Sequence, residues 1–198
     1  KVAIITQETI ARCHHPTYQK SYGDIVQQAC HTGQAQPHMI IIPDGEPAKT
    51  MSCVEDIIGQ LIHLNFERID TIIALGGGIV TDLVGFVASI FLRGVNYISI
   101  PTSLLAQVDA SIGGKTGVNH SLGKNLIGSF YHPSLIYTDP DTIQTLSQDD
   151  IRCGLAEIIK IAGMQDPLLW HDIVKKKDDM INNMAFILNH KTLAQWKQ

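Results

Sequence analysis

The stretch TIIALGGGIVTD, residues 71–82, decides the fold. Its first part, Thr71–Leu75, is a short apolar run rich in β-branched residues, which predicts a buried strand. The glycines Gly76–Gly78 follow at once, and a helical pattern begins behind them at Val80–Leu92. A glycine turn between a strand and a helix lets a pyrophosphate approach the backbone and the amino end of the helix. The Rossmann fingerprint requires a further glycine where Thr81 stands, so a purely structural turn is an equal alternative.

The alternation of strands and helices continues on both sides of this stretch. Further strands are predicted at Val2–Thr6, Met39–Ile42, Tyr97–Ile100 and Leu135–Thr138, and further helices at Gly23–Thr32 and Ser52–Asn65. This pattern predicts an α/β fold, with a Rossmann-like, mostly parallel sheet covered by helices on both faces. After Leu146 only helical patterns follow, at Gln148–Met164 and Pro167–Lys191. We therefore expect a nucleotide-binding α/β domain over residues 1–146 and the beginning of an all-α domain over residues 147–198.

Composition narrows the class of protein. The chain has 198 residues, of which 44% are hydrophobic, and its formal net charge is −4, from 15 basic and 19 acidic residues. Such a chain buries a large core, and its mildly acidic balance argues against nucleic acid as a partner. Four cysteines without close spacing indicate reduced thiols. No apolar run is long enough to cross a membrane or to act as a signal peptide, so we expect a cytoplasmic protein. Because no initiating Met precedes Lys1, we expect a fragment.

Three more segments that follow predicted strands carry polar side chains. The segment DGEPAK, residues Asp44–Lys49, taken alone is most simply a turn with solvated charges. Thr102 and Ser103 follow the strand that ends at Ile100, and their hydroxyls would ordinarily cap a helix. Asp82 is unusual in an apolar helix start, where it either caps the helix or binds a ligand hydroxyl.

Residues 113–128 hold five glycines around Lys115 and Lys124, and Asp109 and Asn125 flank the lysines. Such a loop can wrap an anionic ligand, with the lysines neutralising phosphate or carboxylate. Interleaved apolar residues favour an ordered, partly buried segment over a flexible surface loop. A nucleotide P-loop is excluded, because that motif requires glycine where Asp109 stands.

Glu157 and Lys160 lie three residues apart in a helical pattern. An exposed ion pair is the simpler interpretation. The apolar neighbours Leu155, Ile158 and Ile159 favour instead an inward carboxylate, which is a candidate metal ligand. The nine histidines include no pair at the i,i+4 spacing of helical zinc sites, so the sequence completes no metal site.

Taken together, these loops resemble the 3-dehydroquinate synthase family. The resemblance rests on six motifs in the family's order: DGEPAK (44–49), GGGIVTD (76–82), GFVASIFLRGVNYISIPTSLLAQVD (85–109), GGKTGVN (113–119), GKNLIGSFYHP (123–133) and GLAEIIK (154–160). It implies an NAD- and metal-dependent carbon–oxygen lyase of the shikimate pathway, hence of chorismate and aromatic amino acid biosynthesis. The enzyme would convert 3-deoxy-D-arabino-heptulosonate 7-phosphate to 3-dehydroquinate and phosphate, with Zn2+ or Co2+ as metal and a homodimer as the expected assembly.

The resemblance also assigns roles residue by residue. It implies NAD contacts at Asp44, Glu46, Lys49, Gly76, Gly77, Gly78, Asp82, Thr102, Ser103, Lys124, Thr142 and Thr145. It implies catalytic or substrate-site roles for Asp109, Lys115, Asn125 and Lys160, and a phosphate contact by Arg93, which could serve a neighbouring subunit. Glu157 resembles the first zinc ligand.

Some positions depart from the family pattern. Ser103 stands for a usual Thr, Gln7 for an Asp that contacts the nucleotide, and Ser147–Asp150 for Pro-x-Arg-Glu. The family's two zinc-binding histidines would lie beyond Gln198, so we expect no turnover by these 198 residues alone. Two alternatives stay open. One is another sugar-phosphate cyclase, such as a 2-deoxy-scyllo-inosose or valiolone synthase, and the other is a truncated, non-catalytic nucleotide-binding product.

Overall fold

Five parallel strands form the main sheet, in the spatial order β2-β1-β3-β4-β7. They are β1 (Val2–Gln7), β2 (Pro37–Ile42), β3 (Thr71–Gly76), β4 (Asn96–Pro101) and β7 (Leu135–Ile136). The structure, a computed structural model, describes residues 1–13, 20–32 and 37–175. The predicted α/β, Rossmann-like fold is confirmed, and the strand expected at 135–138 is only two residues long.

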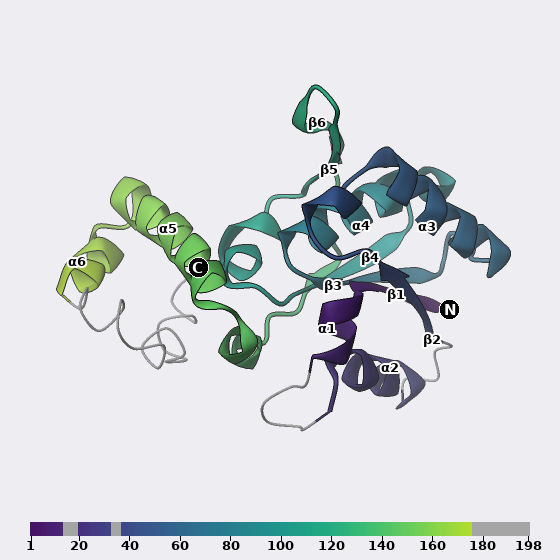
Figure 1. The fold of residues 1–198 in the computed structure, drawn as a ribbon, viewed down its shortest axis with the longest axis horizontal. Helices are drawn as coiled ribbons and strands as arrows, with labels where there is room; N and C mark the ends of the chain where they lie inside the picture. Colours follow the sequence, from purple (N-terminus) through teal and green to yellow (C-terminus); the bar gives the residue numbers. More distant parts are fainter. Residues whose placement is uncertain (14–19, 33–36, 176–198) are drawn as a thin grey trace.

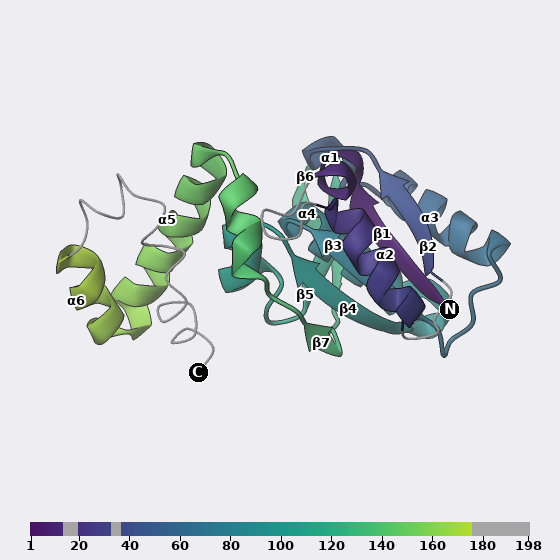
Figure 2. The same ribbon diagram turned by 90° about the horizontal axis from the view of Figure 1, so that it is seen from below.

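Helices cover both faces of the sheet (Figures 1 and 2). One face carries α1 (Glu8–Arg12), which the sequence did not predict, and α2 (Tyr22–Thr32). The other face carries α3 (Met51–His63) and α4 (Gly78–Ile90). Because successive strand residues point to opposite faces, Ala3 and Ile5 pack with α3 and α4, whereas Ile4 packs with Tyr22 of α2. All three strand residues are fully buried.

The topology locates a ligand site. β1 lies between β2 and β3, so the strand order reverses beside β1. In open parallel sheets, ligands bind at the carboxyl ends of the strands next to such a reversal. The segments that follow β2, β3 and β4 are Asp44–Lys49, Gly76–Gly78 and Thr102–Ser103, and they meet at this edge.

The glycine-rich segment 113–128 is not the loop that we expected from its composition. It is an antiparallel hairpin of β5 (Lys115–His120) and β6 (Gly123–Phe130), which stands out from the α/β body in Figure 1. Gly117 and Gly128 pair across it, and a Cβ at Gly128 would lie 2.2 Å from the carbonyl oxygen of Thr116. The glycines thus let two strands cross closely, rather than making the segment flexible.

The chain beyond β7 is helical as far as the structure describes it. After η4 (Pro140–Thr145) come α5 (Gln148–Gln165) and α6 (Pro167–Lys175), which lie to one side of the sheet (Figure 2). Ser147 caps α5 by accepting a hydrogen bond from the backbone N–H of Asp150. Residues 176–191 of the expected last helix lie outside the described residues. Where the chain divides into domains stays a prediction. Among the described helices, none is long and apolar enough to cross a membrane.

Candidate functional site

The glycine turn after β3 is fixed by close packing. A Cβ at Gly76 would lie 2.5 Å from Cγ2 of Val80, and a Cβ at Gly77 would lie 3.3 Å from Oγ of Ser103. Gly77 is the N-cap residue of α4 and offers no side chain to cap it. The amino end of α4 therefore presents backbone N–H groups and a positive dipole end to the strand edge. Asp82 is the fifth residue of α4 rather than its cap, so the capping interpretation of Asp82 is wrong.

Asp82 instead pairs with Lys49 from the segment that follows β2. Lys49 Nζ lies 2.5 Å from Asp82 Oδ2, and only 7% of the Lys49 side chain and 22% of the Asp82 side chain are exposed. The expected turn with solvated charges is therefore wrong for Lys49. Burial raises the pKa of Asp82, although the ammonium of Lys49 acts in the opposite direction. This ion pair joins the segment after β2 to the helix after β3, two strands that lie on either side of β1.

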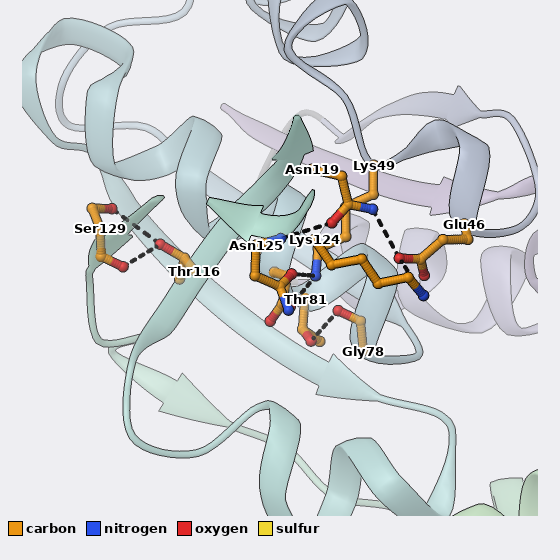
Figure 3. Close-up of polar contacts among 10 residues, drawn as sticks. Glu46, Lys49, Gly78, Thr81, Thr116, Asn119, Lys124, Asn125 and Ser129 are labelled. Carbon is orange, nitrogen blue, oxygen red and sulfur yellow. Dashed lines mark hydrogen bonds and ion pairs between the residues drawn. The ribbon is translucent and has the colours of Figure 1, made fainter. Parts of the chain in front are cut away.

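The hairpin adds a third partner to this pair. Lys49 Nζ also donates to Oδ1 of Asn125 at 2.6 Å, and the backbone N–H of Asn125 donates to Oδ1 of Asn119 at 2.9 Å (Figure 3). Asn125 has a φ of +57°, in the left-handed region that asparagine tolerates better than most residues. The hydrogen bonds hold this backbone conformation and aim the side chain at Lys49.

Glu46 carries the second acidic group of the cluster. Its Oε1 accepts from Nδ2 of Asn119 at 2.8 Å and lies 3.4 Å from Nζ of Lys124. The hydrogen bond from Asn119 and the nearby ammonium of Lys124 lower the pKa of Glu46, and burial only partly opposes them. Glu46 is therefore a half-exposed carboxylate that stays ionised at neutral pH and can accept from ligand hydroxyls.

A cavity of about 490 Å³ opens between α4, the turn η3 (Ala106–Ala110) and the hairpin. Its lining includes four residues to which the resemblance assigns roles: Asp82, Asp109, Lys115 and Asn125. The apolar side chains Leu126 and Phe130 form part of its wall. Two carboxylates, one ammonium and one amide around such a volume suit a small polyol with an anionic group.

Thr102, Ser103, Thr142 and Thr145 form a separate group beside η3. Ser103 Oγ accepts from the backbone N–H of Ala106, so the expected helix-cap role is confirmed for Ser103. Thr142 is buried, and its Oγ1 accepts from Nε2 of Gln107 at 2.8 Å. Gln107 Nε2 also donates to the carbonyl oxygens of Pro101 at 3.2 Å and Asp139 at 3.0 Å, so it ties β4 to η4. η3 is a π-helical turn, a feature frequent at functional sites, and it carries Asp109.

Two predicted site residues lie apart from these groups. Asp44 accepts from Oγ1 of Thr9 at 2.7 Å, which places it beside α1 and not in the Lys49 cluster. Arg93 follows the far end of α4, roughly 20 Å along the helix from the glycine turn. Leu92 and Arg93 both have positive φ, at 48° and 64°, and the exposed Arg93 side chain forms no ion pair within the described residues.

Glu157 and Lys160 lie on α5, with Lys160 Nζ 2.5 Å from Glu157 Oε1. The Glu157 side chain is 16% exposed and that of Lys160 is 59% exposed, so the carboxylate is inward and the ammonium is solvated. The hydrogen bond with Glu157, and then the charge of Asp109, raise the pKa of Lys160. α5, which carries Lys160, packs against η3, which carries Asp109. The described residues contain no group of three His, Cys, Asp or Glu side chains that could hold a metal ion.

Asn119 and Gln107 are the two site residues that our reasoning from sequence missed. Asparagine is uncommon within strands, and Asn119 stands directly after the fully buried Val118, so its presence was the available signal. Gln107 is a buried amide between apolar neighbours, and no spacing in the sequence reveals its partners.

A family profile and the curated relatives agree on one family for this chain. The family profile described as 3-dehydroquinate synthase N-terminal matches residues 39–153. The 3-dehydroquinate synthase of Acaryochloris marina is 48% identical over 152 residues, which cover 77% of this chain and 41% of that protein. The chain spans 41% to 49% of the length of such curated relatives.

Solved structures extend the comparison to bound ligands. The 2-epi-5-epi-valiolone synthase of Streptomyces hygroscopicus subsp. jinggangensis, with NAD+ and Zn2+ bound, is 28% identical with a TM-score of 0.83. The match covers 100% of this chain and 54% of that one. A 2-deoxy-scyllo-inosose synthase complexed with carbaglucose-6-phosphate, NAD+ and Co2+ is also 28% identical, with a TM-score of 0.69 over 80% of this chain and 42% of that one.

Proposed function

The chain belongs to the 3-dehydroquinate synthase family, and we propose that it forms the nucleotide-binding part of a 3-dehydroquinate synthase. The proposed reaction converts 3-deoxy-D-arabino-heptulosonate 7-phosphate to 3-dehydroquinate and phosphate. The observation that carries the proposal is the buried Lys49, whose ammonium joins Asp82 of α4 to Asn125 of the hairpin. This contact brings the nucleotide turn and the lysine-bearing hairpin into one site.

The residues at the strand edge suit NAD. Gly77 and Gly78 leave the backbone at the start of α4 open to a pyrophosphate, because neither residue has a side chain that could cover it. Glu46, held ionised, would accept from ribose hydroxyls, and Lys124 would neutralise phosphate. Thr102, Ser103, Thr142 and Thr145 would line the same nucleotide beside η3. NAD, when bound, would supply the hydride acceptor for a substrate hydroxyl and return the hydride later in the turnover.

The cavity beside this edge suits the sugar phosphate. Lys115 in the cavity wall would hold an anionic group of the substrate, and Asp109 and Asn125 would bind hydroxyls. Lys160, whose ammonium lies within electrostatic reach of Asp109, would add a second positive charge. Asp82, through its ion pair with Lys49, would order the ammonium between the two ligands.

The position of Arg93 favours a role at a second copy of the chain. It lies roughly 20 Å along α4 from the glycine turn, is exposed, is absent from the cavity lining, and forms no ion pair within the described residues. We propose that Arg93 contacts the phosphate bound by a neighbouring subunit, within a homodimer.

Glu157 would supply one ligand to Zn2+ or Co2+, the metals bound by the two cyclase structures above. Its carboxylate is largely covered, as a metal ligand requires. The described residues do not complete the site, so the remaining ligands would come from outside them.

The test is an assay of inorganic phosphate release from the heptulosonate phosphate, with NAD and Zn2+ or Co2+ added. The gene's complete coding sequence and the 198-residue chain are both assayed, since we expect turnover only where the metal ligands are complete. Release by the complete product supports the proposal. If the complete product releases no phosphate from this substrate but turns over an aldose 6-phosphate of the kind that carbaglucose-6-phosphate mimics, that result would assign the protein as another cyclase. No turnover of either substrate would favour a non-catalytic nucleotide-binding product.

A further inference from the structure

Asn119, in β5, uses its backbone N–H and both polar atoms of its side chain on neighbouring site residues. Its backbone N–H donates to the carbonyl oxygen of Lys49 at 2.9 Å, and its Nδ2 donates to Oε1 of Glu46 at 2.8 Å. Its Oδ1 accepts from the backbone N–H of Asn125 at 2.9 Å (Figure 3). One side chain thus contacts both the segment that follows β2 and the far strand of the hairpin.

These contacts close a ring of three residues. Lys49 Nζ donates to Asn125, the Asn125 backbone donates to Asn119, and the Asn119 backbone donates back to Lys49. Asn125 holds its left-handed conformation within this ring. Truncation of the Asn119 side chain would remove the link to the Asn125 backbone, so within this ring the hairpin strand that carries Lys124 and Asn125 would be held only by the hydrogen bond from Lys49 to Asn125.

Glu46 depends on Asn119 more than on its other partner. The Glu46 side chain is 43% exposed, and within the described residues its carboxylate forms one ion pair, with Lys124 at 3.4 Å. The Lys124 side chain is 75% exposed, and such a surface ion pair contributes little to holding a rotamer. The hydrogen bond from Asn119 is shorter and part-buried. Asn119 therefore sets the direction in which the carboxylate of Glu46 points.

We propose that Asn119 is a positioning residue for nucleotide binding: its carboxamide aims Glu46 at the ligand and fixes the hairpin against Lys49. This inference deepens the proposed function and rests on it. It predicts that the loop after β2 and the hairpin act as one unit, so that disturbing the amide weakens NAD binding without any change in a residue that touches NAD.

The experiment compares four variants with the wild-type chain: Asn119→Ala, Asn119→Asp, the double variant Asn119→Asp with Glu46→Gln, and Asn96→Ala. Asn119→Asp keeps the acceptor for Asn125 but sets a carboxylate against Glu46. The double variant restores the hydrogen bond between positions 46 and 119 in the opposite direction, because the Gln amide can donate to the Asp carboxylate. Asn96→Ala is the matched control, since Asn96 is exposed at the amino end of β4 and its side chain donates to Oγ1 of Thr71.

Two quantities are measured for each variant: NAD affinity by calorimetry, and the pKa of Glu46 by carbon-13 NMR without NAD. We expect Asn119→Ala to weaken NAD binding by roughly 10-fold, as loss of a hydrogen bond to a charged group does. We expect Asn119→Asp to weaken it at least as much, the double variant to regain part of the loss, and Asn96→Ala to bind like wild type. The pKa of Glu46 should rise in Asn119→Ala and stay unchanged in Asn96→Ala.

The two measurements separate the failure of this inference from that of the proposed function. Wild-type chain that does not bind NAD contradicts the nucleotide site, while a rise in the Glu46 pKa in Asn119→Ala would still support the positioning role. Folded Asn119→Ala with unchanged Glu46 pKa and unchanged NAD affinity would overturn the inference. A lower unfolding temperature as the only effect would also overturn it, because it would show a merely structural role.

Discussion

Lys49 and Asp82 form a buried ion pair, 2.5 Å between Nζ and Oδ2, that links the segment after β2 to the first turns of α4. The two residues are 33 positions apart in the sequence, and β3 lies between their segments along the chain. The pair therefore depends on the sheet topology, which brings the carboxyl ends of β2 and β3 to one edge of the sheet. Its position at that edge makes it both a structural link and the centre of the proposed site.

Removal of the ammonium should destabilise the fold. Lys49→Met leaves the carboxylate of Asp82 covered without its charge partner, and we expect a loss of about 2 kcal/mol in the free energy of unfolding, less than for a fully buried pair. Lys124→Met is the matched control, because its 75% exposed side chain forms only a 3.4 Å contact and should cost less than about 0.5 kcal/mol. Urea denaturation measures both, and equal losses would contradict the structural importance of the Lys49 pair.

Neighbouring glycines should respond differently to the same substitution. Gly76→Ala places a Cβ 2.5 Å from Cγ2 of Val80, a fully buried and stiff side chain, so we expect destabilisation of about 1–3 kcal/mol. Gly77→Ala meets only Oγ of Ser103, at 3.3 Å, and a small rotation of that serine accommodates it. Thermal unfolding of the two variants measures the contrast. A Gly76→Ala chain as stable as wild type would show that the turn is less tightly packed than described.

The strands and the hairpin show which parts of the fold the sequence could predict and which it could not. The β-branched runs predicted three of the four long strands of the main sheet within one residue at each end, whereas β2 begins two residues earlier than predicted, at Pro37. The hairpin was missed because glycine and polar residues interrupt the apolar residues of β6, and its pairing depends on the contact between Gly117 and Gly128. Glycines that signal flexibility in isolation here permit a close crossing of strands. The short α1 escaped because five residues carry too little periodicity.

The sequence also predicted some of the site residues and missed others. Motif resemblance assigned Lys49, Asp82 and Asn125, and the structure brings them within hydrogen-bonding distance. It could not show that Lys49 is buried, since local sequence favoured a solvated turn. It also could not reveal Asn119 or Gln107, because their partners come from segments distant in sequence. Polar contacts between distant segments depend on the topology of the fold, so composition and local sequence pattern do not predict them.

The pKa of Glu46 predicts a pH dependence of stability. Because its pKa is lowered in the folded chain, mainly by the hydrogen bond from Asn119, ionised Glu46 contributes stability above the ordinary carboxyl pKa of about 4.3. This contribution is lost as the pH falls through the lower folded value. Unfolding measured from pH 7 to pH 3 should therefore show a wild-type advantage over Glu46→Gln that shrinks toward acid. The effect is small because Glu46 is half-exposed, and a constant difference at every pH would contradict it.

Metal binding should depend on Glu157 in the product of the complete coding sequence. We expect Glu157→Ala to lose most of its Zn2+ or Co2+ after dialysis, since a catalytic zinc takes three protein ligands and removal of one weakens it strongly. Asp149→Ala is the control on the same helix, because Asp149 is exposed and pairs with Arg152. Metal content is measured by mass spectrometry of the purified proteins. Full retention of metal by Glu157→Ala would leave the Glu157–Lys160 contact as a structural ion pair.

The most direct test of the nucleotide site is calorimetric titration of the chain with NAD. Wild type should bind one NAD per chain, and Gly77→Val should bind at least 10-fold more weakly, because the side chain blocks the backbone at the start of α4. Gly59→Val is the control, since a Cβ at Gly59 in α3 meets no atom within 4 Å. It should bind NAD like wild type. Equal NAD affinity in wild type and folded Gly77→Val, or no binding by wild type, would contradict a nucleotide site at this turn.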